Sequence, residues 1–279
     1  MIKILADSLN SNTGDRITTF ELSFPRPLLA EMNTHRMLSK NAGSSRAIPI
    51  KKVIERVKES PYIPLFTKNQ KGMQGKIGDK KFQESAKKLW LEALDQAIEN
   101  VLLLEELGVH KQNTNRILEP WMYVPVIVTG TEWSNFFNLR CAEATHPDFR
   151  KIAIQIKELY EKNNPKLLNS GEWHIPFSEG LIEKSNLDLI GTLKIATARC
   201  ARISYATHDG VFDYDRDFQL HDMLLNDKHM SPFEHCAVAV DYSIDEYNEY
   251  AMVRGFEIKT RNFRGFYSYR SHIEDSLAI

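Results

Sequence analysis

The sequence predicts an α+β fold, because patterns typical of long helices and of a few strands occur in it without regular alternation. Phe20, Leu22 and Phe24 alternate with polar residues, which is the two-residue period of a half-buried strand, and Pro25 ends it. From Asp79 to Leu107, apolar residues recur every three or four positions. This second period predicts one long amphipathic helix.

The remaining elements follow in chain order. Residues 27–34 are predicted as a short helix that begins at a proline, and residues 39–49, rich in Ser, Asn and Gly, as a loop attached to it. Further helices are expected over about 147–163, 187–199 and 218–225, and a strand over 237–242. Gly108 is expected to end the long helix. The apolar face predicted for that helix consists of Phe82, Ala86, Leu89, Ala93, Ala97, Val101 and Leu104.

Length, charge and cysteine content narrow the class of protein. The 279 residues are 42% apolar, and no linker divides them, so we expect a single domain over residues 1–279. The 36 basic and 37 acidic residues nearly cancel, which disfavours nucleic acid as a partner. No apolar run reaches the roughly 20 residues that cross a bilayer, and the N-terminus does not resemble a signal peptide. We therefore expect a cytoplasmic protein without a membrane partner, whose three cysteines are reduced thiols.

Residues 34–46 are the most informative segment. They place a histidine, two arginines, a lysine, an asparagine and several serines in one predicted loop. Arginine forks match phosphate oxygens, and serine hydroxyls add uncharged donors, so such a loop can wrap around an anion. A solvated basic turn would have the same composition, and composition alone does not separate the two.

The spacing of these residues resembles the signature of the flavin-dependent thymidylate synthases. That signature is R-H-R-x-x-S-x-N-x-x-S-x-R, and residues 35–46 read H-R-x-x-S-x-N-x-x-S-x-R. The resemblance implies that His35, Arg36 and Asn41 contact FAD. It also implies that Ser44, Ser45 and Arg46 bind the pyrimidine nucleotide.

Two further segments support the resemblance. Residues 229–235 resemble the family's H-x-[ST]-P-x-E-H segment, and residues 201–204 resemble its A-R-V-S strand, which implies that Ser204, Ser231 and His235 lie on the cofactor side. Without the motif around it, His235 would be read as a hydrogen-bonded core histidine. Residues 135–140 resemble the family's N-F-x-x-L-R helix start and imply that Arg140 contacts the nucleotide phosphate, although surface arginines also form ion pairs of little energetic value.

The chain departs from the family pattern in several places. Thr34 stands where the signature has its first arginine, and the H-x-[ST]-P-x-E-H segment follows the arginine-rich segment instead of preceding it. This order predicts a circularly permuted or rebuilt chain of the kind found in a phage-like branch of the family. We expect Arg264 or Arg270 to supply the cation lost at Thr34. Substitutions at Glu31 and Ala42 affect the expected recognition of the base.

The resemblance implies long helices packed on a small, mainly antiparallel sheet, with matching segments over residues 20–168 and 196–270. It implies reductive methylation of dUMP at C5 with FAD as cofactor and with NADPH and 5,10-methylenetetrahydrofolate as co-substrates. Arg46, Ser44 and Arg140 are the expected catalytic residues, and a homo-oligomer, expected to be a homotetramer, is implied. No cysteine lies in a Pro-Cys-His context that would serve the flavin-independent route.

Several alternatives remain open. The same scaffold could methylate or hydroxymethylate another pyrimidine deoxynucleotide such as dCMP. A serine of the loop could act as a nucleophile with His35 as its base. A protein without catalysis could bind nucleotides or single-stranded nucleic acid through Arg36, Arg46, Tyr267 and Tyr269. The histidine and cysteine spacings do not match a metal motif, so no metal is expected.

Overall fold

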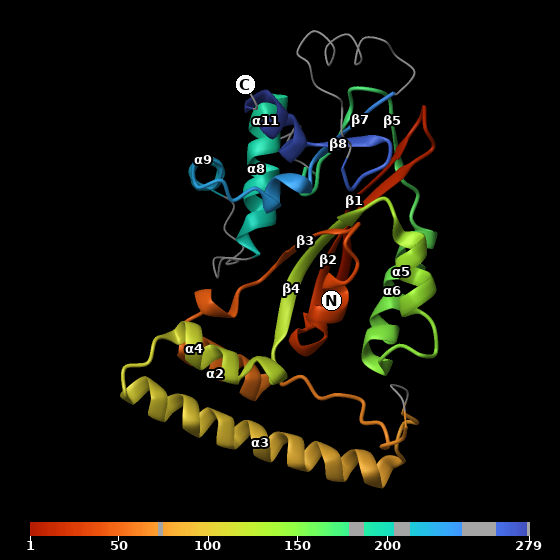
Figure 1. The fold of residues 1–279 in the computed structure, drawn as a ribbon. Coiled ribbons are helices and arrows are strands. Elements are labelled where there is room, and N and C mark those ends of the chain that lie inside the picture. The colour runs from red at the N-terminus through yellow and green to blue at the C-terminus, as the bar shows by residue number, and fades with distance from the viewer. Residues whose placement is uncertain (72–74, 179–186, 204–212, 242–260, 278–279) are drawn as a thin grey trace.

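The computed structural model describes residues 1–71, 75–178, 187–203, 213–241 and 261–277, and Figure 1 shows their arrangement. One sheet has the order β3-β4-β2-β1-β5, with antiparallel neighbours except for the parallel pair β1 and β5. A second, antiparallel sheet has the order β6-β7-β8. The strands are β1 (Ile2–Asn10), β2 (Arg16–Pro25), β3 (Ser39–Ala42), β4 (Tyr123–Gly130), β5 (Lys166–Leu168), β6 (Trp173–His174), β7 (Ala237–Ala239) and β8 (Phe266–Ser268).

Helices surround the first sheet. The α-helices are α1 (Leu29–Asn33), α2 (Ile50–Glu59), α3 (Lys80–Glu106), α4 (Lys111–Ile117), α5 (Trp133–Arg140), α6 (Pro147–Lys162), α8 (Leu189–Arg202), α9 (Tyr214–Asn226) and α11 (Tyr269–Leu277). Short 3-10 turns are η1 (Arg26–Leu28), η2 (Ser45–Ala47), η3 (Glu119–Trp121) and η4 (Ser231–Glu234). Long helices on a small, mainly antiparallel sheet are the α+β architecture that the sequence predicted.

The two faces of the first sheet differ in chemistry. On one face, alternating side chains of β2 and β4 pack with α5 and α6 in a core that contains Phe20, Trp133 and Phe149. On the other face, Ile127 of β4 contacts Cys200 in α8. Figure 1 shows α5 and α6 on the opposite side of the strands from α8. Of the polar residues that alternate with Phe20, Thr19 is therefore buried under a second layer of protein, whereas Glu21 and Ser23 are partly exposed.

Most predicted elements are confirmed, and three need correction. The strand at residues 19–25 and the helices expected over 27–34, 147–163, 187–199 and 218–225 are present, with shifted ends. Residues 39–42 were expected in a loop but form β3. Ser and Asn have a low intrinsic preference for strands, but these residues pair antiparallel with the edge of β4, and its backbone hydrogen bonds hold them in the sheet. The strand expected over 237–242 ends at Ala239, and residue 242 lies outside the described residues.

The long helix is confirmed as α3, but only part of its predicted apolar face is buried: Ala97 and Val101 are buried, whereas Leu89 and Ala93 are exposed. Asp79 caps its start by accepting a hydrogen bond from the backbone N–H of Phe82, and Gly108, at φ +80°, follows its end. Its buried residues are Leu94, Ala97, Ile98 and Val101, which pack on α2 and α4. Leucines occur on several sides of this helix, so the three-to-four-residue period fits more than one stripe. Contact with α2 and α4 determines which stripe is buried.

The second sheet is joined to the first through a shared core. Ile17 of β2 and Leu168 of β5 pack with Ala237, Phe263 and Phe266. This contact places the C-terminal third of the chain against the N-terminal strands. Among the described residues, no helix is long and apolar enough to cross a membrane.

Candidate functional site

The arginine-rich segment and the H-x-[ST]-P-x-E-H segment meet in space, although about 190 residues separate them. The hydroxyl of Ser231 in η4 donates to Asn41 Oδ1 in β3 at 3.0 Å. Asn41 Nδ2 in turn donates to the backbone carbonyl of Cys200 in α8 at 3.2 Å. Asn41 is buried, so these bonds replace its contacts with water. Its side chain connects the two motif segments and does not line an open surface as a cofactor contact would.

A pocket of about 190 Å³ lies where these segments adjoin the C-terminal part of the chain. Ser39 of the first motif and Glu234 of the second line it together with residues that follow position 260. The full lining is Ser39, Glu234, Arg261, Asn262, Phe263, Ser268 and Arg270. The pocket therefore combines both motif segments with Arg270, one of the two arginines expected to supply the cation lost at Thr34.

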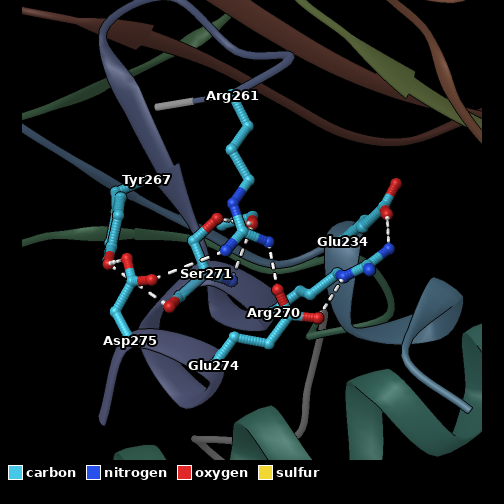
Figure 2. A network of polar contacts seen from close by, with 8 residues as sticks. Glu234, Arg261, Tyr267, Arg270, Ser271, Glu274 and Asp275 are labelled. Atoms are coloured by element: carbon cyan, nitrogen blue, oxygen red, sulfur yellow. Dashed lines mark hydrogen bonds and ion pairs between the residues drawn. The ribbon is translucent and has the colours of Figure 1, made fainter. Parts of the chain in front are cut away.

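Two arginines of the pocket are held by carboxylates, as Figure 2 shows. Arg270 donates from Nη1 to Glu234 at 2.5 Å and from Nε to Glu274 of α11 at 2.8 Å. Arg261 pairs with Glu274 and with Asp275, the latter at 3.5 Å. Burial opposes the charge of Glu274, but hydrogen bonds from both arginines outweigh it and lower the pKa of that carboxyl group. The guanidinium groups are thus fixed in position at the wall of the pocket.

Arg140 occupies the environment of the missing signature arginine. Its Nε donates to His35 Nε2 at 2.7 Å, and its Nη2 donates to Thr34 Oγ1 at 2.9 Å and to the carbonyl of Glu31 at 3.1 Å. Arg264 and Arg270, which we expected to replace the cation lost at Thr34, pair with other residues: Arg264 with Glu132 at 2.8 Å, and Arg270 with Glu234 and Glu274. The guanidinium next to Thr34 therefore comes from the end of α5.

His35 is buried and accepts the hydrogen bond from Arg140. Its pKa is lowered to about 4, mainly by burial, and the nearby charges of Arg140 and Lys40 act in the same direction. The ring is neutral at pH 7, and Nε2 is the acceptor, so the proton is on Nδ1. A ring fixed in this way is unavailable as a base for a nucleophilic serine, which removes support from that alternative.

His235 lies in the protein core and has no exposed surface. Its Nδ1 is hydrogen-bonded to Thr129 Oγ1 at 2.8 Å, and Thr129 Oγ1 to Thr19 Oγ1 at 2.7 Å. The series continues to His174 Nε2 at 2.8 Å and from His174 Nδ1 to Ser8 Oγ at 2.9 Å. Burial lowers the pKa of both histidines to about 3. The Nε2 atom of His235 is buried without a hydrogen-bond partner among the described residues, so the core histidine reading accounts for only one of the two ring nitrogens, and the cofactor contact of His235 stays a prediction.

Besides the buried Ser45, the first motif has three residues whose side-chain donors are not engaged by any described residue. Ser45 is buried and donates to Glu119 Oε1 at 2.6 Å, so it has no free donor for a nucleotide, in contrast to its predicted role. Arg36 and Arg46 are exposed, and within the described part of the chain neither makes an ion pair. Ser44 is partly exposed, and its hydroxyl makes no hydrogen bond to a described residue.

Some site residues were not predicted, and one predicted residue cannot be placed. Glu234 lies inside a recognised motif, and that motif could have identified it as a pocket residue. Arg261, Glu274 and Asp275 follow no motif spacing, and only tertiary contacts bring them together. Ser204 lies outside the described residues. Among the residues that the structure describes, no group of three His, Cys, Asp or Glu side chains is arranged to hold a metal ion.

Comparison with protein families assigns the chain to a class. Residues 16–166, more than half of the chain, match the model of the Thy1 family, described as thymidylate synthase complementing protein. The chain belongs to this family. Comparison with curated proteins gives no match.

Among solved structures, the chain is similar to the crystal structure of a UMP/dUMP methylase, PolB, from Streptomyces cacaoi, bound with 5-Br UMP. The two share 16% sequence identity, with a TM-score of 0.46. The similarity covers 58% of this chain and 88% of that chain.

Proposed function

We propose that this protein is a flavin-dependent thymidylate synthase that methylates dUMP at C5. The observation that carries the proposal is the contact between Asn41 and Ser231, which joins two motif segments of the family at one pocket in a chain whose motif order is permuted. Membership of the Thy1 family supports the same reaction class. Residues 1–279 would act as a single catalytic domain.

The proposed reaction balances as follows. The C5–H of dUMP is replaced by a methyl group, methylenetetrahydrofolate becomes tetrahydrofolate, and NADPH becomes NADP⁺ with uptake of one proton. Bound FAD would supply hydride transfer and relay of the one-carbon unit. The protein has to bind and orient three anionic ligands and to stabilise negative charge on the pyrimidine.

The exposed donors of the first motif fit phosphorylated ligands. Arg46 and Ser44 would bind the nucleotide, and Arg36 would face the cofactor, because none of the three is engaged by another described residue. A guanidinium without a carboxylate partner can pair with phosphate without breaking an existing ion pair. Arg140 is held by Glu31, Thr34 and His35, so we assign it to positioning of this segment.

The pocket is too small for a whole ligand. Pockets for ligands of this size usually enclose roughly 300–1,000 Å³, whereas this one encloses about 190 Å³. It would hold one part of FAD or of a nucleotide, and the remainder would lie on surface outside it. A homo-oligomer, with a homotetramer as the proposed form, could supply that surface from another subunit.

The visible absorption spectrum tests this function. Purified protein is incubated with FAD and desalted, and its spectrum is recorded with and without dUMP. We expect a retained flavin band that shifts when dUMP is added, because the nucleotide would lie beside the isoalloxazine ring. Turnover of dUMP and dCMP, with the mass of each product, then distinguishes methylation of dUMP from methylation or hydroxymethylation of dCMP. Absence of retained flavin would contradict the proposal.

The non-catalytic alternative loses structural support. Tyr267 is buried, so it offers no stacking surface for a base. Tyr269 is stacked on His221, with their ring planes 22° apart. Single-stranded nucleic acid is usually bound by exposed aromatic rings, and these two are engaged inside the protein. Tight, salt-dependent binding of an oligonucleotide without flavin would restore this alternative.

A further inference from the structure

Side chains from outside the first motif fix the segment that carries Ser44 and Arg46. Four carbonyl oxygens of residues 43–48 accept hydrogen bonds from η1 and α4: Gly43 from Arg26 at 2.7 Å, Ala47 from Lys111 at 3.1 Å, and Ser45 and Ile48 from Asn115 at 2.7 and 2.8 Å. Each bond turns a carbonyl group toward the protein, which leaves fewer conformations open to the backbone around it. The conformation of the segment is therefore set by residues that the first motif does not contain.

Glu119 of η3 and Arg26 of η1 hold this segment on both sides of Ser44. Glu119 Oε1 accepts a hydrogen bond from Ser45 Oγ at 2.6 Å and lies 3.0 Å from Arg26 Nη2. Nη1 of the same guanidinium donates to the carbonyl of Gly43 at 2.7 Å. The side chains of Arg26 and Glu119 are 17% and 22% exposed, so water screens this ion pair less than it screens a pair at the surface. One guanidinium and one carboxylate thus bind the residue before Ser44 and the residue after it.

Close packing also fixes the start of the segment. The N–H of Gly43 donates to the carbonyl of Pro125 in β4 at 2.8 Å. A Cβ atom at position 43 would lie 3.0 Å from Cδ of Pro125, which is closer than carbon atoms normally pack, so only glycine fits without a shift of its neighbours. Gly43 and Ser45 are buried, whereas Ser44 is partly exposed and Arg46 is exposed. The fixed backbone therefore directs the side chains of Ser44 and Arg46 outward.

Rigid turns carry the two charged side chains. Arg26 is followed by Pro27 at the start of η1, and Glu119 is followed by Pro120 at the start of η3. Proline fixes φ at about −65°, so both turns have little conformational freedom. The backbone N–H of Arg26 donates to the carbonyl of Met122, directly after η3, at 2.9 Å, and this bond ties the two turns together. The two side chains therefore start from fixed positions, and forming their ion pair costs little additional conformational entropy.

The ion pair also determines the charge next to Arg46. Glu119 contacts Ser45, the neighbour of Arg46, and an unpaired carboxylate at this place would attract the guanidinium of Arg46 and repel a phosphate group. Because Arg26 balances the charge of Glu119, the guanidinium of Arg46 keeps its charge for a ligand.

We propose that Arg26 and Glu119 are positioning residues for nucleotide binding, which hold residues 43–47 in the conformation that directs Ser44 and Arg46 at the phosphate group. The inference rests on the proposed function, in which Ser44 and Arg46 bind the nucleotide. Arg26 and Glu119 act through Gly43 and Ser45 and do not themselves contact the ligand.

Binding of dUMP in two backgrounds tests this role. The dissociation constant is measured from the shift of the flavin band of the FAD-loaded protein, for the wild type, Glu119→Ala, Arg46→Ala and the double variant. We expect Glu119→Ala to raise the dissociation constant at least about tenfold in the wild-type background but less than about threefold in the Arg46→Ala background, because the loss acts through Arg46. A side chain that only stabilises the fold would have the same effect in both backgrounds. An equal effect in both, or no effect in either, would overturn the proposal.

Further variants separate positioning from folding. Glu119→Gln keeps an oxygen that accepts from Ser45 and from Arg26, so its dissociation constant should stay within about threefold of the wild type. Arg26→Met keeps an unbranched apolar stem but leaves Glu119 unpaired, and it should weaken binding at least as much as Glu119→Ala, which it replaces in the test if that variant does not fold. Glu55→Ala, at an exposed position of α2, is the matched control and should bind dUMP like the wild type. Wild-type affinity of Arg26→Met, or a loss in Glu119→Gln as large as in Glu119→Ala, would contradict the positioning role.

The wild-type titration distinguishes failure of this inference from failure of the proposed function. A wild-type protein that retains flavin but gives no saturable response to dUMP would reject the proposed function and the positioning role with it. A saturable wild-type response, with unchanged affinity in Glu119→Ala and Arg26→Met, would reject the positioning role alone.

Discussion

Within the described part of the chain, the arginines near the pocket and the first motif are of two kinds, those held by protein acceptors and those without such an acceptor. Arg140, Arg261 and Arg270 are each held by acceptors of the protein, which fixes their guanidinium groups. Arg36 and Arg46 have no such acceptor in the described part of the chain. Fixed arginines shape the site, and free arginines can exchange water for a phosphate group.

Loss of a free arginine should therefore affect binding and not stability. We expect Arg46→Ala to raise the KM for dUMP at least tenfold, because a bidentate phosphate contact is lost, and to change the free energy of unfolding by less than about 0.5 kcal/mol. Steady-state kinetics and urea unfolding measure the two quantities. Arg56→Ala, on exposed α2, is the matched control and should have wild-type kinetics. Equal kinetics for both variants would exclude Arg46 from the nucleotide site.

Buried histidines couple protonation to stability. Burial is the main cause of the low pKa of His35, which is about 4, and of His174 and His235, which are about 3, and burial also lowers the pKa of His221. In the unfolded chain these groups titrate near 6.5. At a pH between 6.5 and the pKa values of the folded protein, the unfolded state binds more protons than the folded state. Stability is therefore complete above about pH 6.5 and falls as the pH falls toward the folded pKa values.

The expected result is a loss of unfolding free energy as the pH falls from 6.5 to 5. Each histidine contributes a slope that approaches about 1.4 kcal/mol per pH unit below its unfolded pKa. Carboxylates with lowered pKa values, such as Glu274, contribute only below about pH 4.5, so this window reports the histidines. Urea unfolding at several pH values measures the slope. His35→Gln should reduce this slope by the contribution of one histidine, up to about 1.4 kcal/mol per pH unit. A slope unchanged by the substitution would contradict the lowered pKa of His35.

At the scale of elements, β3 carries the connection between the two motif segments. It has four residues and pairs with β4 on one side only. Its attachment to α8 and η4 depends on the side chain of Asn41, which donates to Cys200 and accepts from Ser231. A buried amide with both functions satisfied specifies one arrangement of these elements.

Replacing the donating amide nitrogen of Asn41 with an oxygen that can only accept should disrupt this connection. We expect Asn41→Asp to lower the free energy of unfolding by about 3 kcal/mol, because a carboxylate would face the carbonyl of Cys200 in a buried position. Ser231→Ala removes one donor and should cost about 1 kcal/mol. Urea unfolding with an unchanged m-value measures both. Wild-type stability of Asn41→Asp would show that β3 is held by other contacts.

At the scale of the whole molecule, the apolar clusters determine whether the chain unfolds as one unit. The two sheets share a core through Ile17 and Phe266. Helices α2, α3 and α4 form a separate cluster around Leu94 and Trp121, which joins the first sheet through the segment leading into β4. The strongest candidate for independent unfolding is therefore the α2 to α4 region.

We expect a single cooperative transition, in agreement with one catalytic domain over residues 1–279. The four tryptophans lie in different parts of the molecule: Trp90 in α3 and Trp121 in η3, which pack together, Trp133 beside the first sheet and Trp173 on the second sheet. Unfolding curves of variants that keep only Trp121, Trp133 or Trp173 should coincide. An earlier transition for Trp121 alone would show that the α2 to α4 region is a separate folding unit.

Some features of this protein could be read from local patterns alone. The alternation around Phe20 and the capped periodic segment from Asp79 to Gly108 predicted a strand and a helix, because period and capping are local properties of the chain. Motif spacing also identified residues 34–46, 135–140 and 229–235 as parts of one family signature. Periodicity could not select the buried stripe of α3, and composition could not show that residues 39–42 extend a sheet.

The sequence by itself thus determined the fold class, the family and the segments from which the site is built. Only the tertiary structure decided which side chains of those segments are available to a ligand. His35, Asn41 and Ser45 match the signature, yet each is buried and its side chain is already hydrogen-bonded to another part of the protein. The physical reason is that a residue's type and spacing set what it can bind. Its partners in the folded chain decide whether that capacity is already used.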